Sequence, residues 1–321
     1  MKKNRIIITS TMALILLCSC ASTPAVQQEK SSTQNKNHKS DTQVVTIEET
    51  PEEKFLKSLE GITISKVSSP KEITKGRNFS EPFVFSAKKA DGTPVEGLDI
   101  SLLYPSSKTD GIISYSKIQT KTDAEGKVSF TAPQTTFAAN AKVVVSPTPI
   151  NDSQELSEKL EKFTARADWK VKSDIASKGA VLFIWDFNEK NRPVNNSTHI
   201  QGEFRGRGIT MVGNGPVNET SYIGNPKALY KDTYDIIGGN QYGYLIYGTI
   251  KFAEPVTAAE DDSGYYCVLK AEIEAVSMKN GNKIYSSAIT YKETGKNWNE
   301  CVSKGKDKLS QLVVDDIIYG L

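Results

Sequence analysis

Histidine is scarce in this sequence: His38 and His199 are the only two in 321 residues. Histidine is the side chain that most often acts as acid or base near neutral pH. His38 lies in a polar stretch and is expected to be solvated, and the position of His199 at a predicted helix start is typical of a surface residue. Enzyme motifs are missing as well: the sequence has no phosphate-binding loop, no H-E-x-x-H and no G-x-S-x-G. We therefore expect no catalytic residue, no cofactor and no enzyme activity.

Neither sign of charge dominates, and long apolar runs are rare. Lysine and arginine number 40 against 38 aspartates and glutamates, which leaves a net charge of +2. A balance so close to zero provides no field that would attract nucleic acid. Beyond residues 6–17, no apolar run approaches the length that spans a bilayer. We expect no nucleic-acid partner and no spanning helix.

An acidic cluster at Glu260, Asp261 and Asp262 is the one candidate for a cation site. Calcium prefers several carboxylate oxygens, but it usually takes them from the D-x-[DN]-x-[DN]-G pattern, which is absent here. The cluster falls between two predicted strands. We therefore interpret it as a solvated hairpin tip and expect no metal site.

The N-terminus has the layout of a secretory signal. Residues 1–5 are basic, residues 6–17 are apolar, and Ser19 is a small residue just before Cys20. With Leu17 three residues before the cysteine, this pattern resembles the bacterial lipobox, although Cys18 departs from the usual residue at its position, as looser spirochaete lipoboxes do. The alternative is ordinary secretion with cleavage nearby.

The lipobox resemblance implies a processed, lipid-anchored protein. Residues 1–19 would be the lipoprotein signal peptide, and Cys20 would be the lipid attachment site, carrying diacylglycerol and a further acyl chain such as palmitate. Ala21 is not the aspartate that retains lipoproteins at the inner membrane in well-studied Gram-negative bacteria. The resemblance therefore favours the outer membrane over the inner, with the protein facing the periplasm or the surface.

Residues 20–56 form a polar stretch that we expect to be a disordered tether. Its run from Gln27 to Ser40 is nearly free of apolar side chains. Such a segment cannot bury enough surface to offset the entropy lost on ordering.

Residues 57–175 have the alternating pattern of short antiparallel strands. Phe83, Phe85 and Ala87 share one face of a predicted strand, and turn signals recur between such runs. This spacing predicts an all-β sandwich. The phrases D-G-T-P-V-E-G at 91–97 and T-D-A-E-G at 122–126 resemble bacterial Ig-like modules of the invasin type, which implies a spacer or binding module without catalytic residues.

A helix interrupts this pattern before the last strand of the predicted sandwich. The polar stretch at 152–162 opens with Asp152, which we expect to be the N-cap, and Glu155 stands at the capping-box position.

Residues 176–321 predict an α+β domain. The continuous apolar run at 180–187 is typical of a central strand covered on both faces. Asn225 followed by Pro226 predicts a helix start, and Asn297 caps a final helix. The remaining elements give the order β-α-β-α-β-β-β-α, so we expect a three- to five-stranded sheet with packed helices.

This C-terminal half resembles the periplasmic fold of the CsgG, LpoB and TolB N-terminal domain families. The resemblance depends on residues 180–187, on Y-L-I-Y-G-T-I at 244–250 and on the hairpin at 278–285. It is also similar to spirochaete lipoproteins that pair such a domain with an Ig-like half. The similarity to these spirochaete lipoproteins implies no known activity. The CsgG- and LpoB-like relatives assemble machines or contact partners, which implies a protein partner and leaves oligomerisation open.

Two cysteines remain in the folded region, Cys267 and Cys301. An even pair in an exported protein favours a disulfide, and the alternative is two reduced thiols packed as small hydrophobic groups. Taken together, the sequence predicts a lipid-anchored envelope lipoprotein with a non-catalytic binding or assembly role. The alternative is a surface-displayed adhesin or antigen that uses the Ig-like module.

Overall fold

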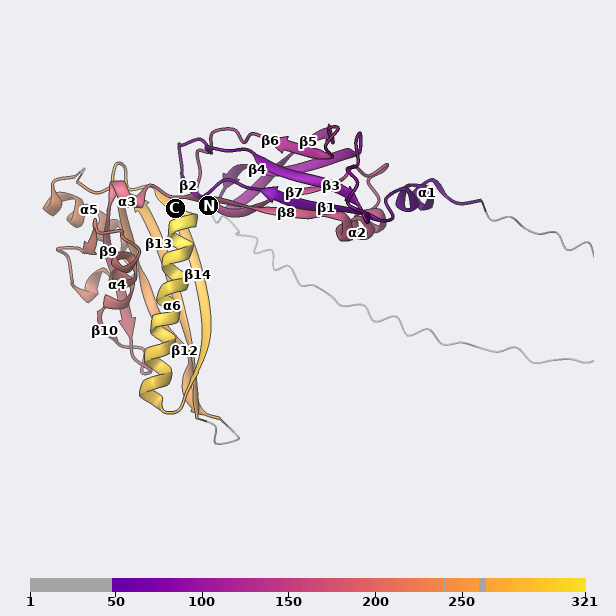
Figure 1. Cartoon of the computed structure of the whole chain (residues 1–321). Coiled ribbons are helices and arrows are strands. Elements are labelled where there is room, and N and C mark those ends of the chain that lie inside the picture. The colour runs from indigo at the N-terminus through magenta and orange to yellow at the C-terminus, as the bar shows by residue number, and fades with distance from the viewer. Residues whose placement is uncertain (1–47, 240, 260–263) are drawn as a thin grey trace, which may run out of the picture. The chain divides into compact units, whose positions relative to one another are not determined.

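The computed structural model describes residues 48–239, 241–259 and 264–321 (Figure 1). From Glu49 to Leu321 the chain is one unit, within which an N-terminal β lobe and a C-terminal α+β lobe have separate hydrophobic cores.

The N-terminal lobe contains two sheets. The first has the order β1-β3-β6 and the second β2-β8-β7-β4-β5. The bounds in the first sheet are β1 Ile62–Ser68, β3 Phe83–Lys89 and β6 Lys127–Phe130. Those in the second are β2 Ile73–Thr74, β4 Asp99–Thr109, β5 Ile112–Lys121, β7 Ala139–Pro147 and β8 Ala165–Lys172. Apart from the short β2, which runs parallel to β8, all neighbouring strands are antiparallel. The expectation of a β-rich lobe is confirmed.

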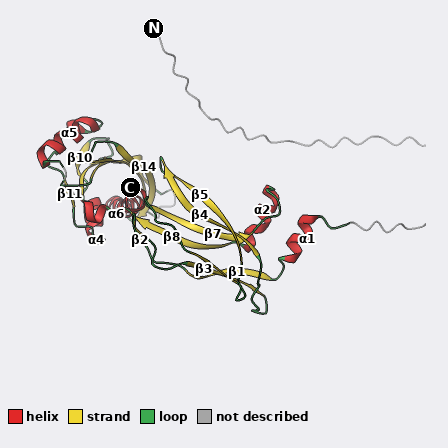
Figure 2. Ribbon diagram, turned by 90° about the horizontal axis from the view of Figure 1, so that it is seen from above, coloured by secondary structure: helices red, strands yellow, loops and turns green. Residues whose placement is uncertain are grey.

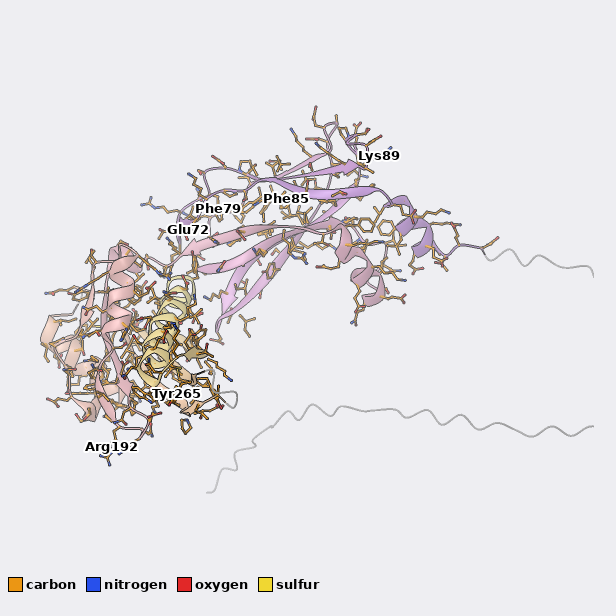
Figure 3. The ribbon with its side chains drawn as sticks, turned by 60° about the horizontal axis from the view of Figure 1, so that its bottom comes forward. Glu72, Phe79, Phe85, Lys89, Arg192 and Tyr265 are labelled. Carbon is orange, nitrogen blue, oxygen red and sulfur yellow. The ribbon has the colours of Figure 1, made fainter. Side chains whose placement is uncertain are left out.

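The two sheets share an aromatic core. Trp169 on β8 is fully buried and stacks on Phe83 of β3, with ring centroids 5.6 Å apart. Phe79 packs edge-on against the same indole at 4.9 Å, and Figure 3 labels it together with Phe85. Alternate residues of β8 point into this core, which is the period-two burial that its sequence predicts.

Two short helices close a small satellite core beside the sandwich. Helix α1 spans Pro51–Ser58 and α2 spans Gln154–Leu160, followed by a 3-10 turn at Glu161–Phe163. Leu59 and Leu156 meet in this cluster. Helix α1 was not expected, although its Thr50 cap is a recognisable start signal. The inserted helix is present, but the expected cap was wrong: Ser153, and not Asp152, accepts from the Leu156 amide at 3.4 Å.

The C-terminal lobe is built on one mixed sheet with the order β10-β9-β12-β13-β14, and β11 also pairs with β9. The strands are β9 Ala180–Phe187, β10 Pro193–Asn196, β11 Val212–Asn214, β12 Tyr244–Ala258, β13 Tyr265–Ser277 and β14 Lys283–Gly295. The sheet therefore has six strands and not three to five. The additional strand, β10, is only four residues long and is formed by pairing with β9, so no periodicity of its own marks it.

Helices cover both faces of this sheet. They are α3 Ile175–Lys178, α4 Thr198–Gly206, α5 Pro226–Ile237 and α6 Trp298–Gly320, with a 3-10 turn at Thr220–Tyr222. Helices α4 and α6 pack on one face and α5 on the other (Figure 2). Every residue of β9 is buried, as expected for a central strand covered on both faces.

Local capping signals locate the starts of α5 and α6 correctly. The Asn225 side chain accepts from the Ala228 amide, and Pro226 occupies the first turn of α5. Asn297 caps α6 by accepting from the Glu300 amide at 2.9 Å. Leu229 and Thr233 are the buried residues of α5, whereas Ile236 is 60% exposed.

Candidate functional site

Several residues singled out from the sequence lie outside the described residues. Cys20, the predicted lipid site, is among them, as are His38 and the acidic cluster at Glu260, Asp261 and Asp262. Lipid attachment therefore stays a prediction from the lipobox pattern.

The two folded cysteines lie close together in the α4/α6 side of the core. Cys267 on β13 and Cys301 on α6 are both buried, and both thiols are free in this structure. The Cys267 thiol donates to the Cys301 carbonyl oxygen at 3.4 Å, and the Cys301 thiol donates to the Glu293 carbonyl at 3.4 Å. Burial, followed by the contact with Cys301, raises the pKa of Cys267 to about 12. In this state the pair packs as neutral thiols, and the disulfide stays a prediction.

A cavity of about 400 Å³ lies at the carboxyl end of β9, on the sheet face that α4 and α6 cover. It is bounded by the end of β9, the loop that leads into β10, and the first turns of α4 and α6. Arg192 in that loop is labelled in Figure 3. Cavities of this size at strand ends are typical of small-molecule sites.

The loop beside the cavity is organised by one side chain. Asn188 accepts from the backbone amides of Lys190 and Arg192, each at 3.0 Å, and closes a tight turn. Glu189 then accepts from the Val256 amide at 2.9 Å, which ties the loop to β12. The rim of the cavity is therefore held by hydrogen bonds to backbone groups.

Asp186 is the most unusual residue in the wall. It is the second-to-last residue of a fully buried strand, and its side chain is only 4% exposed. One carboxylate oxygen, Oδ2, pairs with the Lys306 ammonium of α6 at 2.9 Å. The other oxygen, Oδ1, is buried and has no hydrogen-bond partner among the described residues. A buried carboxylate oxygen without a donor is costly, so this atom requires a partner.

Apolar side chains form the opposite side of the cavity. Trp298, in the first turn of α6, is 41% exposed although it lines the cavity. Phe252 on β12 and Val302 on α6 contribute to the same wall. Trp298, Val302 and Lys306 are spaced by four residues, so they share one face of α6. The cavity therefore combines an apolar surface with a buried acceptor.

A second hollow, of about 460 Å³, adjoins the first between α4 and α6. Thr198 and His199 line both. His199 Nδ1 lies 2.8 Å from the Asp307 carboxylate, which bridges the two helices. Ser310, at 2% exposure, lines the second hollow, and its hydroxyl lacks a partner among the described residues.

His199 makes its recorded hydrogen bond to Asp307, and no described serine, threonine or cysteine donates to it. Within the described ranges, no group of three or more His, Cys, Asp or Glu is placed to hold a metal ion. The lobe is thus an α+β domain with a ligand-sized cavity beneath two helices.

Sequence reasoning missed this cavity, although one signal was present. The prediction that residues 180–187 form a strand covered on both faces is correct. Charged residues are rarely buried in such a strand, and this one has a carboxylate next to its end. Asp186 was that exception. His199 was assigned to the surface, and its side chain is 35% exposed in contact with Asp307.

Comparisons with known proteins place the C-terminal lobe among lipoproteins. Residues 179–318 match the family model for the TP0693-like lipoprotein, C-terminal domain. This match supports a bacterial lipoprotein with a C-terminal domain of that kind. A search of curated proteins found no match.

Solved structures give weaker likenesses. A PelC dodecamer from Paraburkholderia phytofirmans is 19% identical, with 44% of this chain and 87% of that chain covered and a TM-score of 0.27. Lipoprotein GNA1162 from Neisseria meningitidis is 16% identical, with 43% and 96% covered and a TM-score of 0.25. The hypothetical protein CT253 from Chlamydia trachomatis is 10% identical, with 44% and 93% covered and a TM-score of 0.26.

Proposed function

We propose that this protein is a lipid-anchored lipoprotein of the bacterial envelope whose folded lobes bind a partner and catalyse no reaction. The observation that carries the proposal is the lipobox-like sequence ending in Cys20, joined in one chain to a lobe that matches a lipoprotein family at residues 179–318. No helix in the part of the chain that the structure describes has the length and apolar character needed to cross a membrane. A lipid at Cys20 would therefore supply the membrane attachment.

The energetics of such an anchor are favourable. Each buried methylene contributes about 0.8 kcal/mol, so two or more acyl chains hold a protein stably on a bilayer. Residues 21–48 would then separate the folded unit, which begins at Glu49, from the membrane surface.

Metabolic labelling with radioactive palmitate tests the anchor. We expect the full chain to take up label and the Cys20→Ala variant to lose it. Cys18→Ala is the matched control, because Cys18 leaves with the signal peptide and its removal should leave labelling intact. Label that persists in Cys20→Ala would contradict the proposal.

The binding role is supported by the two lobes themselves. We infer that the N-terminal β lobe is an Ig-like module of the invasin type and that the C-terminal lobe has the periplasmic fold of the CsgG and LpoB families. Modules of these kinds make contacts and do not carry catalytic residues. Crosslinking in intact cells followed by mass spectrometry should return one reproducible envelope protein, and its absence from repeated experiments would count against the role.

The alternative function is that of a surface-displayed adhesin or antigen. It predicts a protein on the outside of the cell, whereas the first proposal predicts one in the periplasm. Protease treatment of intact cells separates the two. We propose attachment at the outer membrane, facing the periplasm, so the protein should survive the protease until the outer membrane is permeabilised. Loss from intact cells would favour surface display.

The proposal also includes a disulfide between Cys267 and Cys301 after export. The export compartment supports it, and so does the contact between the two residues. A thiol assay on unfolded, unreduced protein isolated from the envelope should detect no free thiol in the acylated chain. Two reactive thiols per chain would refute the bridge.

A further inference from the structure

We propose that the outer edge of β14 pairs with the same strand of a second copy of this chain, so that two α+β lobes share one continuous sheet. The pairing is antiparallel and is centred on Ala288. The interface lies within the α+β lobe, so this inference does not depend on the lipid anchor or on the disulfide.

Strand β14 presents a long open edge. It is the last strand of its sheet, and no described strand pairs with its outer side (Figure 1). It is 13 residues long, and none of these residues is buried. Among the described residues, the recorded backbone hydrogen-bonding partner of residues 284–291 is β13. Alternate N–H and C=O groups along the outer side are therefore available to another strand.

The other sheet edges in the described part of the chain are protected. Strands β2, β6, β10 and β11 have only two to four residues each. Strand β1 has a register shift beyond Lys66, and β5 has the exposed Lys117 near its middle. Short strands, bulges and charged side chains are the devices that keep an edge from pairing with another chain.

Strand β14 lacks these devices over most of its length. Residues 284–291 read I-Y-S-S-A-I-T-Y, without a charge, a proline or a glycine. The one register shift with β13 falls at the start of the strand, beside Lys283. A long, uncharged edge rich in β-forming residues is expected to be covered by another strand.

The sequence of β14 is complementary to itself, which identifies a second copy as the covering strand. With Ala288 opposite the partner's Ala288, Tyr285 falls opposite the partner's Tyr291, and Ser286 falls opposite the partner's Thr290. Aromatic pairs and pairs of hydroxyl residues are cross-strand neighbours that stabilise a sheet. The charged residues of β14 lie outside this segment, so the register places no two like charges opposite each other.

The two faces of the strand match in this register. Tyr285, Ile289 and Tyr291 pack against the core beneath α6, and the residues between them are exposed on the other face. Because residues directly opposite each other share a face, both α6 helices lie on the same side of the joined sheet.

Helix α6 adds an apolar contact beside this edge. The Tyr285 hydroxyl donates to Asp316, so this side of α6 faces β14. Leu312 precedes Asp316 by four residues and therefore lies on the same side of the helix, where it is partly exposed. A second copy at the β14 edge would shield this side chain from water.

Sedimentation equilibrium of the full chain, in detergent matched in density to the solvent, measures its association. We expect twice the monomer mass at about 100 µM protein, a concentration at which weak homodimers are populated. Monomer alone at that concentration would overturn the proposal. A series of species larger than the dimer would overturn it as well, because pairing through β14 uses up the edge of both copies.

Ala288→Lys tests the centre of the interface. Ala288 is exposed, so the change is compatible with the folded lobe, but in the dimer two ammonium groups would face each other. The dissociation constant should rise about fivefold. Gln119→Lys adds the same charge at an exposed position of β5 and should leave the constant unchanged. Equal constants in Ala288→Lys and the unchanged chain would contradict pairing at this edge.

Two double variants test the register. Within the sheet, Ser286 lies opposite Glu274 and Thr290 lies opposite Lys270. Ser286→Lys with Thr290→Glu therefore sets opposite charges against each other both within the sheet and across the interface, and it should dimerise at least as tightly as the unchanged chain. Ser286→Lys with Thr290→Lys sets like charges against each other across the interface and should weaken the dimer about tenfold.

Thermal unfolding of both double variants checks that the lobe is folded, and the variant with opposite charges keeps the test valid if the other is not. Equal dissociation constants in two folded double variants, or the reverse order, would rule out the register centred on Ala288. A dimer weaker in the variant with opposite charges than in the unchanged chain would rule it out as well.

Discussion

The two lobes differ in the number of buried polar atoms that lack a hydrogen-bond partner. The β lobe has a core of aromatic and aliphatic side chains around Trp169, and alternate residues of its strands face solvent. The α+β lobe buries the charged side chain of Asp186, which pairs with the partly exposed Lys306 of α6. Buried polar atoms that lack a partner among the described residues are also concentrated in the α+β lobe. They are Trp185 Nε1, Asp186 Oδ1, Asn196 Oδ1, Ser197 Oγ and Ser310 Oγ, against Trp169 Nε1 in the β lobe and Ser173 Oγ between the two.

This difference between the lobes affects their stability. The β-lobe core contains one such atom, Trp169 Nε1, so desolvated polar groups cost this core little stability. A buried charge with one unsatisfied oxygen lowers stability unless something binds to it. Most of the unsatisfied buried polar atoms among the described residues therefore lie in the α+β lobe, and each of them lowers its stability.

The largest effect should come from removing the centre of the apolar core. Trp169→Ala should lower the unfolding free energy of the β lobe by about 3–5 kcal/mol, because it deletes a fully buried indole and leaves a cavity. Denaturant unfolding followed by circular dichroism measures the change. Trp298→Ala, which removes the same side chain from an exposed position, should cost less than about 1 kcal/mol. If Trp169→Ala and Trp298→Ala lose similar amounts of unfolding free energy, the buried indole of Trp169 contributes no more to stability than an exposed one.

Breaking the buried ion pair should have the next largest effect, confined to the α+β lobe. Lys306→Met should destabilise that lobe by about 3 kcal/mol, since it leaves the Asp186 carboxylate buried without a counter-ion. Adding Asp186→Leu in the same chain should recover much of the loss, because the uncompensated charge disappears. Hydrogen exchange resolved by residue locates the effect. If Lys306→Met alone is as stable as the unchanged protein, the ion pair does not stabilise the α+β lobe.

A smaller effect is expected at the start of α6, the helix that carries Trp298 and Lys306. Asn297→Ala removes the acceptor for the Glu300 amide and should cost about 1 kcal/mol. Asn297→Asp keeps an acceptor and should cost much less. Thermal unfolding compares the two, and equal losses would show that capping by this side chain contributes little.

Low pH should produce the smallest loss of unfolding free energy. It should act through Asp174, the residue that precedes α3. Burial tends to raise the pKa of Asp174, but hydrogen bonds from Lys178, at 2.7 Å, and Tyr244 outweigh it and lower the pKa from 3.8 to about 2. Because the folded pKa is depressed, the stabilisation is complete above about pH 4 and is lost as pH falls toward 2. The loss should be on the order of 1 kcal/mol after solvent screening.

Asp174→Asn should abolish that part of the acid dependence. Asp235→Asn, at an exposed position on α5, is the matched control and should leave the acid titration unchanged. Unfolding free energies measured between pH 2 and pH 5 compare the three proteins. An identical pH dependence in Asp174→Asn and the unchanged protein would show that this carboxylate is not linked to folding.

Much of the fold followed from local patterns. The period-two runs, the buried strand β9 and the Asn225 and Asn297 caps each depend on residues close together in the chain, and each was predicted correctly. Strand β10 was missed because its four residues acquire strand structure only by pairing with β9. The Ser153 cap was misassigned to the adjacent Asp152, since both residue types accept hydrogen bonds from a helix start.

The candidate site was harder to predict for the same reason. Asp186, His199, Trp298 and Lys306 come from three separate segments of the sequence, and nothing in their local patterns links them. Sequence reasoning assigned His199 to the surface and treated Asp186 as part of an apolar strand. Only the packing of α4 and α6 across the end of β9 brings these side chains to one cavity.

What the sequence alone determined was which of the longer segments form helices and which form strands, because helix caps and strand alternation depend on neighbouring residues. What only the tertiary structure decided was which charged groups are removed from water and which of their atoms remain without a partner. A side chain becomes buried when segments that are distant in the sequence pack around it. The Asp186 oxygen acquires its energetic cost only when α6 packs over the sheet.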